Sequence, residues 1–422
     1  MPFSALNLGP NILKAVQEAG YTEPTPIQAE AIPQIMTGHD LIGIAQTGTG
    51  KTAAFVLPIL SMMSNGAPRR GTRVLIVAPT RELVVQIEEN VRAYAKHLPL
   101  RMATIFGGVG ERQQIEALRS GTDLVIATPG RLIDLMGQRH GDFSGLDFLV
   151  LDEADRMLDM GFLPQIRRIV KVLPKKRQTL MFSATLSREI EGLTHEFQHS
   201  PKTVQIGRRA NPAETVTQLV YEVPSSLKPA LLTHLLLDAA FDSVLVFTRT
   251  KHGADRIARR LEMHQVRTAT LHSNRSQNQR LRALKEFKSG EVRVLVATDI
   301  AARGIDVDGI SHVINYDFPM HSEDYVHRIG RTGRALAIGD AISFVTPDDH
   351  GALRSLERFI GRGLVRKKAE GFDYNAPAPA PEPRQERQGE RRFAPSRPGG
   401  NRRPSGPPRN GGRGGGRRGG GR

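Results

Sequence analysis

The chain of 422 residues contains no cysteine and no tryptophan, and aromatic residues make up only 5% of it. The absence of cysteine excludes disulfides as well as thiolate-ligated zinc and iron–sulfur sites. No stretch approaches the ~18 consecutive apolar residues of a membrane-spanning helix, and the N-terminal sequence lacks the basic and then apolar pattern of a secretory signal. We therefore expect a soluble, cytoplasmic protein without membrane association.

Positive charge, by contrast, is abundant, with a formal net charge of +16. Half of it lies in residues 371–422, where 12 arginines stand against 4 acidic residues. Because the rest of the chain is also basic, a polyanionic partner is one interpretation, and a role in solubility alone is the other. The C-terminal segment is rich in Pro, Gly and Arg and cannot bury enough apolar surface to offset its chain entropy. We expect a disordered basic tail over 367–422.

Short apolar runs alternate with helix-like segments along residues 1–366, in two series. This pattern is typical of parallel sheets with helices on both faces. The likeness of VLIVAPTRE (74–82) to VLVFTRTKH (244–252) suggests two domains of one architecture, and a polar segment with Gly and Pro separates them. The sequence therefore predicts an α/β protein with an N-terminal domain over 1–207, a linker over 208–215, a C-terminal domain over 216–366 and the tail.

The stretch GIAQTGTGKT (43–52) matches the phosphate-binding loop G-x-x-x-x-G-K-[ST] except that Ala45 replaces the first Gly. Only the later positions bring the backbone close to an anion, so Ala45 can end the preceding strand with ordinary φ. Backbone amides at the start of the following helix would hold phosphate oxygens. Lys51 would reach the β- and γ-phosphates, and the Thr52 hydroxyl would bind Mg²⁺. The alternative is a glycine-rich loop before a core helix.

A second group of polar residues, DEAD (152–155), follows the apolar run FLVL. An aspartate at a strand end, here Asp152, can hold Mg²⁺, usually through water. The adjacent Glu153 can orient or deprotonate an attacking water. The alternative is a set of acids that only favours the dipole at a helix N-terminus.

Together, AQTGTGKT and DEAD resemble the motifs of the DEAD-box family of ATP-dependent RNA helicases, and the likeness extends in order over roughly residues 1–350. The resemblance implies two tandem RecA-like domains, ATP and Mg²⁺ as cofactors and RNA as partner. It implies that Gln28 reads the adenine edge, that Tyr21 and Phe3 contact the ring, and that Asp306 bonds the ribose. The remaining ATP-binding residues would be Ala45, Gln46, Thr47, Gly48, Thr49, Gly50, Lys51 and Thr52.

The same resemblance assigns RNA-binding and coupling residues. Those expected to grip the RNA backbone are Thr80, Arg81, Gly108, Thr128 and Arg131 in the first domain and Thr248, Arg249, Thr298, Arg303 and Gly304 in the second. The segment SAT, with Ser183, Ala184 and Thr185, would link hydrolysis to strand separation. Its hydroxyls would bond the acids at 152–155, Asp155 among them.

The segment YVHRIGRTGR (325–334) resembles the family's arginine-finger motif. Its three cations, His327, Arg331 and Arg334, are spaced i, i+4 and i+7, so one helical face would carry all three. Two glycines weaken any helix there, and unfavourable local sequence that carries several cations is typical of a functional site. The alternative is a solvated basic face.

The resemblance implies an RNA-dependent ATPase that locally separates short RNA duplexes and remodels RNA or RNA–protein complexes as its two domains close and open. The alternatives are an ATP-locked RNA clamp with little unwinding and a DNA helicase. The Arg/Gly-rich tail resembles that of bacterial RhlE-type members, and ribosome-assembly or RNA-degradation complexes are possible partners.

Overall fold

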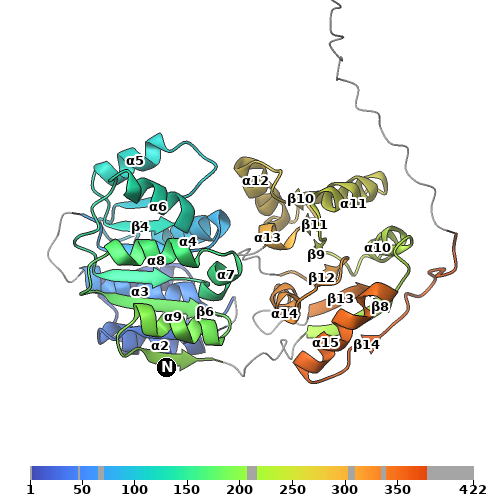
Figure 1. Ribbon diagram of the computed structural model, residues 1–422, viewed down its shortest axis with the longest axis horizontal. Coiled ribbons are helices and arrows are strands. Elements are labelled where there is room, and N and C mark those ends of the chain that lie inside the picture. The colour runs from blue at the N-terminus through green and yellow to red at the C-terminus, as the bar shows by residue number, and fades with distance from the viewer. Residues whose placement is uncertain are drawn as a thin grey trace, which may run out of the picture. The chain divides into compact units, whose positions relative to one another are not determined.

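The computed structural model describes residues 2–45, 48–64, 71–206, 216–302, 309–333 and 339–377. These residues build two α/β domains, which we call the first domain (2–206) and the second domain (216–377). Each contains a seven-stranded parallel sheet with helices on both faces (Figure 1). The predicted α/β fold with two domains of one architecture is confirmed. The tail predicted to be disordered lies, from residue 378 onward, outside the described residues, as does the predicted linker.

The sheet of the first domain has the order β3-β4-β2-β5-β6-β1-β7. Its strands are β1 (Leu41–Ile44), β2 (Val74–Val77), β3 (Met102–Ile105), β4 (Leu124–Ala127), β5 (Phe148–Leu151), β6 (Gln178–Ser183) and β7 (Lys202–Gln205). Its helices are η1 (Phe3–Leu6), α1 (Pro10–Glu18), α2 (Pro26–Met36), α3 (Lys51–Ser64), α4 (Arg81–Tyr94), α5 (Arg112–Arg119), α6 (Pro129–Gly137), α7 (Ala154–Asp159), α8 (Leu163–Val172) and α9 (Arg188–Phe197).

The sheet of the second domain has the corresponding order β10-β11-β9-β12-β13-β8-β14. Its strands are β8 (Val216–Glu222), β9 (Val244–Phe247), β10 (Thr268–Leu271), β11 (Val294–Ala297), β12 (His312–Asn315), β13 (Gly339–Val345) and β14 (Val365–Arg366). Its helices are α10 (Lys228–Leu236), α11 (Lys251–Met263), α12 (Gln277–Lys288), α13 (Asp299–Ala302), α14 (Ser322–Ile329), η2 (Pro347–Asp349) and α15 (His350–Ile360).

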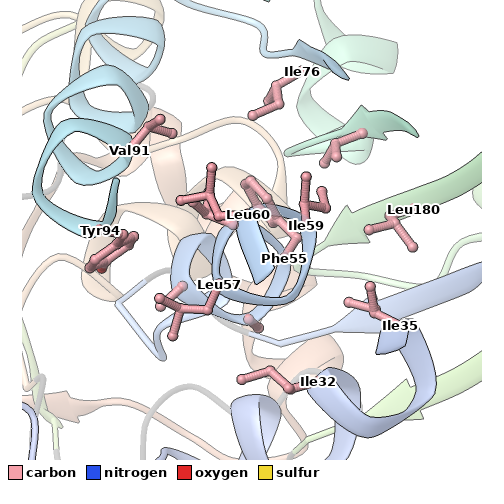
Figure 2. Close-up of a cluster of buried hydrophobic side chains, with 14 of the residues drawn as sticks. Ile32, Ile35, Phe55, Leu57, Ile59, Leu60, Ile76, Val91, Tyr94 and Leu180 are labelled. Atoms are coloured by element: carbon pink, nitrogen blue, oxygen red, sulfur yellow. The ribbon is translucent and has the colours of Figure 1, made fainter. Parts of the chain in front are cut away.

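Successive residues of a strand pack against opposite faces of the sheet, so the continuous apolar runs of the sequence feed two cores. In β2, Val74 and Ile76 join the core beneath α2, α3 and α4, whereas Leu75 and Val77 join the core beneath α6, α7 and α8. Figure 2 shows the first of these cores, with Phe55 and Leu60 of α3 at its centre. Helix α3 is buried along most of its length, which fixes the helix that begins at the phosphate loop.

The ordered chain continues past the predicted boundary at residue 366. Lys367 donates its backbone N–H to the carbonyl of Val220 at 2.8 Å, and Phe372 and Tyr374 pack against the core of the second domain. The Phe372 ring lies 5.5 Å from the His234 ring. The composition did not predict this ordered segment, because only a few aromatic contacts anchor a stretch that is otherwise mostly exposed.

Strand β1 shows how tightly the first sheet is packed behind the site. Gly43 lies beside Phe182 in the parallel register of β1 and β6, and a Cβ atom at Gly43 would lie 2.5 Å from the Phe182 ring. A larger residue at position 43 would therefore displace either the ring or the strand that leads into the phosphate loop.

We predict that Gly43→Ala destabilises the first domain by about 1–3 kcal/mol, because overpacking forces neighbouring side chains or backbone to shift. The measurement is the thermal unfolding midpoint, which should fall by several degrees. The control is Gly192→Ala on the exposed side of α9, where a Cβ meets nothing within 4 Å. Equal midpoints for the two variants would contradict the packing account of Gly43.

Candidate active site

The phosphate loop lies where β1 ends and α3 begins. Ala45 continues β1, since its N–H donates to the Ser183 carbonyl at 3.0 Å. Gly48 and Gly50 have φ of 84° and 89°, in the left-handed region that favours glycine. Lys51 is the first residue of α3 and is buried, and its Nζ donates to the carbonyl of Ala45 at 2.7 Å. The loop thus holds its lysine against its own backbone.

Lys51 and its loop line a pocket of about 280 Å³. The predicted ATP residues Tyr21, Gln28, Gly48, Gly50, Lys51 and Thr52 line it together with Asp152 and Glu153. Phe3 is buried and stacks on Tyr21, with ring centroids 6.4 Å apart, so it supports the tyrosine from outside the pocket. The structure adds four lining residues of α4 that sequence reasoning missed, Leu83, Gln86, Asn90 and Tyr94. Their spacing along one helical face was the available signal.

The Gln28 amide joins α2 to the phosphate loop. Its Oε1 accepts the backbone N–H of Thr25 at 3.0 Å, and its Nε2 donates to the carbonyl of Gly50 at 3.1 Å. Gln28 is buried, so both ends of the amide are held by backbone groups. Gln28 therefore contacts the phosphate loop, in addition to the contact with adenine that the sequence predicts.

Two acids occupy the end of β5 inside the pocket. Asp152 is buried, and its backbone N–H donates to the Val77 carbonyl at 2.9 Å. Burial raises the pKa of Asp152 to about 7, with Lys51 opposing the rise and Glu153 adding to it. A raised pKa means that the positive charge near Asp152 is too small to offset the cost of burying its carboxylate. Oxygen donors from Asp152 and Thr52 on the wall of one pocket are the ligand type that Mg²⁺ prefers, so these residues fit the ion.

Glu153 has an unusual backbone conformation and a charged partner. Its φ and ψ are 51° and 52°, the left-handed region that a residue with a Cβ atom rarely adopts. Its carboxylate Oε2 lies 3.1 Å from the Arg156 guanidinium, and both side chains are buried. The acid therefore has a fixed place in the pocket wall.

The loop after β6 is tied to the acids through Asp155. The Oδ2 of this carboxylate accepts the backbone N–H groups of Ala184 and Thr185 at 3.0 and 3.1 Å, and the Thr185 hydroxyl at 3.3 Å. The Ser183 hydroxyl accepts the Thr185 N–H at 3.4 Å instead. Burial alone would raise the pKa of Asp155, but the positive charge of Lys51 and Arg156 and the hydrogen bond from the Arg156 N–H oppose it, and that pKa is lowered.

Cationic side chains gather at the ends of the neighbouring strands. Arg81 packs against Gly107 and Gly108, and the latter has φ of 80° and leaves no room for a Cβ atom beside that guanidinium. Burial lowers the pKa of Arg81, and the positive charge of Arg280 and Arg131 lowers it further, while Glu82, which pairs with Arg280 at 3.1 Å, opposes the shift. The Nη1 of Arg131 is buried and, among the described residues, has no hydrogen-bond partner. Such a cluster favours an anion.

Other residues expected to bind RNA also lie where helices begin. Thr80 caps α4, its hydroxyl accepting the Leu83 N–H at 3.3 Å, and Thr128 precedes α6. In the second domain the Thr248 hydroxyl and the Arg249 N–H both donate to Asp317, at 2.9 and 2.7 Å, and Thr298 follows β11. All of these lie at carboxyl ends of parallel strands, where folds of this type place their sites.

The finger segment follows α14, which ends at Ile329 with Gly330 as its C-cap. The prediction of one helical face was wrong, because the helix stops before Arg331, and the glycines noted in the sequence explain why. Burial lowers the pKa of His327 to about 4, and the charge of Arg156 acts in the same direction. Arg331 is buried.

The predicted site residues outside the described part of the chain are Gln46, Thr47, Arg303, Gly304, Asp306 and Arg334.

Comparison with known proteins identifies both domains. Residues 25–193 match the DEAD/DEAH box helicase family, and residues 227–336 match the helicase conserved C-terminal domain. The chain is 45% identical over 388 residues to DEAD-box ATP-dependent RNA helicase 30 of Arabidopsis thaliana, covering 88% of this chain and 65% of that protein. It is 41% identical over 372 residues to helicase CshA of Streptococcus pneumoniae, covering 88% and 70%.

Solved structures of DEAD-box proteins have the same fold as this chain. S. cerevisiae Dbp5 bound to RNA and ADP BeF3 has a TM-score of 0.79 at 30% identity, covering 87% of this chain and 95% of that one. Mss116 bound to ssRNA and UDP-BeF has a TM-score of 0.81 at 27% identity, covering 88% and 81%. No helix in the described part of the chain is long and apolar enough to cross a membrane. With both domain types in order and relatives this similar, the chain belongs to the DEAD-box family of ATP-dependent RNA helicases.

Proposed function

We propose that this chain is an RNA-dependent ATPase that separates short RNA duplexes locally and remodels RNA or RNA–protein complexes. The observation that carries the proposal is the pocket that combines Lys51, Asp152 and Glu153, with a cluster of arginines at the neighbouring strand ends. The pocket supplies what ATP hydrolysis needs, and the cluster supplies what a nucleic-acid backbone needs. Relatives are named as RNA helicases, and related structures contain RNA and ATP analogues.

In the nucleotide pocket each residue has a separate task. Lys51 exchanges the Ala45 carbonyl for phosphate oxygens, and Gln28 and Tyr21 hold the adenine. Asp152 and Thr52 would hold Mg²⁺, partly through water, and this ion neutralises phosphate charge when bound. Glu153 accepts the proton of the attacking water. Arg331 and Arg334 act from the second domain and stabilise negative charge on the transferred phosphoryl group. His327, neutral near pH 7 because its pKa is lowered to about 4, acts as a hydrogen-bonding group, while Asp306 bonds the ribose.

The RNA groove grips one strand by its backbone. Arg81, Arg131 and the residues at the strand ends of both domains contact phosphates, with Arg303 and Gly304 completing the second domain's share. Backbone contacts carry no sequence information, so the core does not select a base sequence. Binding of ATP and RNA favours a closed state of the two domains, and hydrolysis reopens it.

The cellular location, the subfamily and the protein partners are proposed from the core and the tail. We place the protein in the cytoplasm, in the RhlE-type subfamily, and with ribosome-assembly or RNA-degradation complexes as secondary partners, on the strength of the compact core and the Arg/Gly-rich tail. An ATP-locked RNA clamp uses the same motifs. Multiple-turnover strand separation supports the helicase, and long-lived RNA binding in ATP without separation supports the clamp.

Glu153→Gln should leave ATP and RNA binding intact and abolish turnover, because an amide cannot take the proton of water. The measurements are the RNA-stimulated ATPase rate and titration with a fluorescent ATP analogue. Glu30→Gln, an exposed position on α2, is the matched control and should hydrolyse ATP at the parent rate. A Glu153→Gln protein that also does so would remove Glu153 from the mechanism.

Arg131→Ala should weaken RNA binding without changing the maximal ATPase rate, because its buried Nη1 is available for a phosphate. Loss of one phosphate contact on a single strand should reduce the slope of log affinity against log salt by about 0.7. RNA affinity across a salt series measures this. The control is Arg92→Ala, an exposed residue of the same domain paired with Glu88, which should leave the slope unchanged. A slope equal to the parent's would contradict the phosphate contact.

Truncation after Pro377 should preserve the ATPase maximum and weaken RNA affinity, since it removes 12 arginines but no residue of the pocket. The arginines add phosphate contacts and stacking on exposed bases, so the salt dependence of RNA binding should flatten as well. Affinities of the truncated and the full chain are compared across a salt series. Identical curves would favour a tail that docks protein partners.

A further inference from the structure

We propose that Arg156 is a positioning residue for ATP hydrolysis, which holds the Glu153 carboxylate in place in the wall of the nucleotide pocket. This inference rests on the proposed role of Glu153 as the base that activates water. Arg156 is itself absent from the pocket lining, and it therefore acts through the acid.

The pair is built into one turn of chain. Arg156 lies in α7, three residues after Glu153, and its Nη1 donates to Oε2 of the acid at 3.1 Å. The two side chains are 3% and 5% exposed. An exposed pair at this spacing would contribute little, because water and salt screen it. A buried pair resists separation, since either charge left alone would lack a partner in a poorly solvated place.

The backbone of Glu153 is already fixed without Arg156. Its N–H donates to Asp152 Oδ1 at 3.0 Å, and its carbonyl accepts the Met157 N–H at 3.0 Å. A left-handed conformation costs a residue other than glycine roughly 1–2 kcal/mol, and it persists here because both neighbours hold it. What remains free is the Glu153 side chain, whose rotamer freedom is worth up to ~2 kcal/mol. The Arg156 guanidinium removes that freedom.

Such precision has a use in this reaction. A base must lie within hydrogen-bond reach of the proton it takes, and a displacement of about 1 Å can cost about 100-fold in rate. Glu153 lines the same pocket as Lys51, and one oxygen of its carboxylate accepts the bond from Arg156.

Two other roles would leave the same ion pair. Arg156 could serve only to stabilise α7, in which case its removal would lower stability and not the rate per folded molecule. It could also restrain Glu153 from reaching water until RNA binds, in which case its removal would raise the rate without RNA. The experiment below separates both from positioning.

The test uses the full chain with saturating RNA and the variants Arg156→Met and Arg156→Lys. We expect Arg156→Met to lower kcat by roughly 10–100-fold, with KM for ATP and half-saturating RNA within about twofold of the parent. Arg156→Lys keeps the charge without the planar fork and should recover part of the rate. The control Arg168→Met, at an exposed position of α8, should behave as the parent. Thermal melts and binding of a fluorescent ATP analogue give the folded fraction.

A double-mutant cycle decides the mechanism. In single turnover, Glu153→Gln and Glu153→Gln with Arg156→Met should share one residual rate, because Arg156 has no base left to position. A further fall of the same size as in the parent background would overturn the proposal, as would a parent kcat in Arg156→Met or a raised rate without RNA. If Arg156→Met does not fold, Arg156→Lys carries the same cycle. A Glu153→Gln protein at the parent rate would instead sink the proposed function of Glu153.

Discussion

The buried carboxylate of Asp155 ties the loop after β6 to the segment that carries the acids at the end of β5. It accepts two backbone N–H groups and a hydroxyl from the loop after β6, although it belongs to the helix after β5. Burial of an unpartnered carboxylate would be costly, so loss of these bonds would be unfavourable. The lowered pKa of Asp155 reflects the cations around it. Asp155 is thus a direct link between this loop and the segment that carries Asp152 and Glu153.

Parallel strands explain why so many functional residues share one edge. The loop residues after β1, β2, β4, β5 and β6 all leave the sheet at its carboxyl end, and those after β9, β11 and β12 do so in the second sheet. Because both cores fill the space on either side of the strands, the polar residues can only collect beyond the strand ends. The buried strands that precede these loops then restrict the conformations that the loops can adopt.

Much of this was predictable because the motifs are local. The phosphate loop, the acids at 152–155 and the strand runs are each specified by a short stretch, and the structure has strands where the apolar runs predict them. The pair of Glu153 and Arg156 is also local in sequence. Its strength depends on the burial of both side chains, however, and the amino-acid sequence alone does not show that burial. The bond from Gln28 to Gly50 and the α4 face in the pocket join distant segments. The anchoring of Phe372 is of the same kind, since only the fold brings it to His234.

Asp152 and Arg81 each keep an unfavourable electrostatic environment, although Lys51 partly offsets that of Asp152 and Glu82 that of Arg81. Asp152 has a pKa raised to about 7 because burial outweighs the single ammonium near it, and Arg81 has a lowered pKa because burial is joined by two further arginines. The first group is stabilised by an added cation and the second by an added anion. Under the proposed function, a metal ion bound with ATP would supply the positive charge and the RNA backbone the negative charge. Each ligand would thus relieve an electrostatic penalty that the folded chain already carries, and a ligand shifts a conformational equilibrium only through such a difference in interaction.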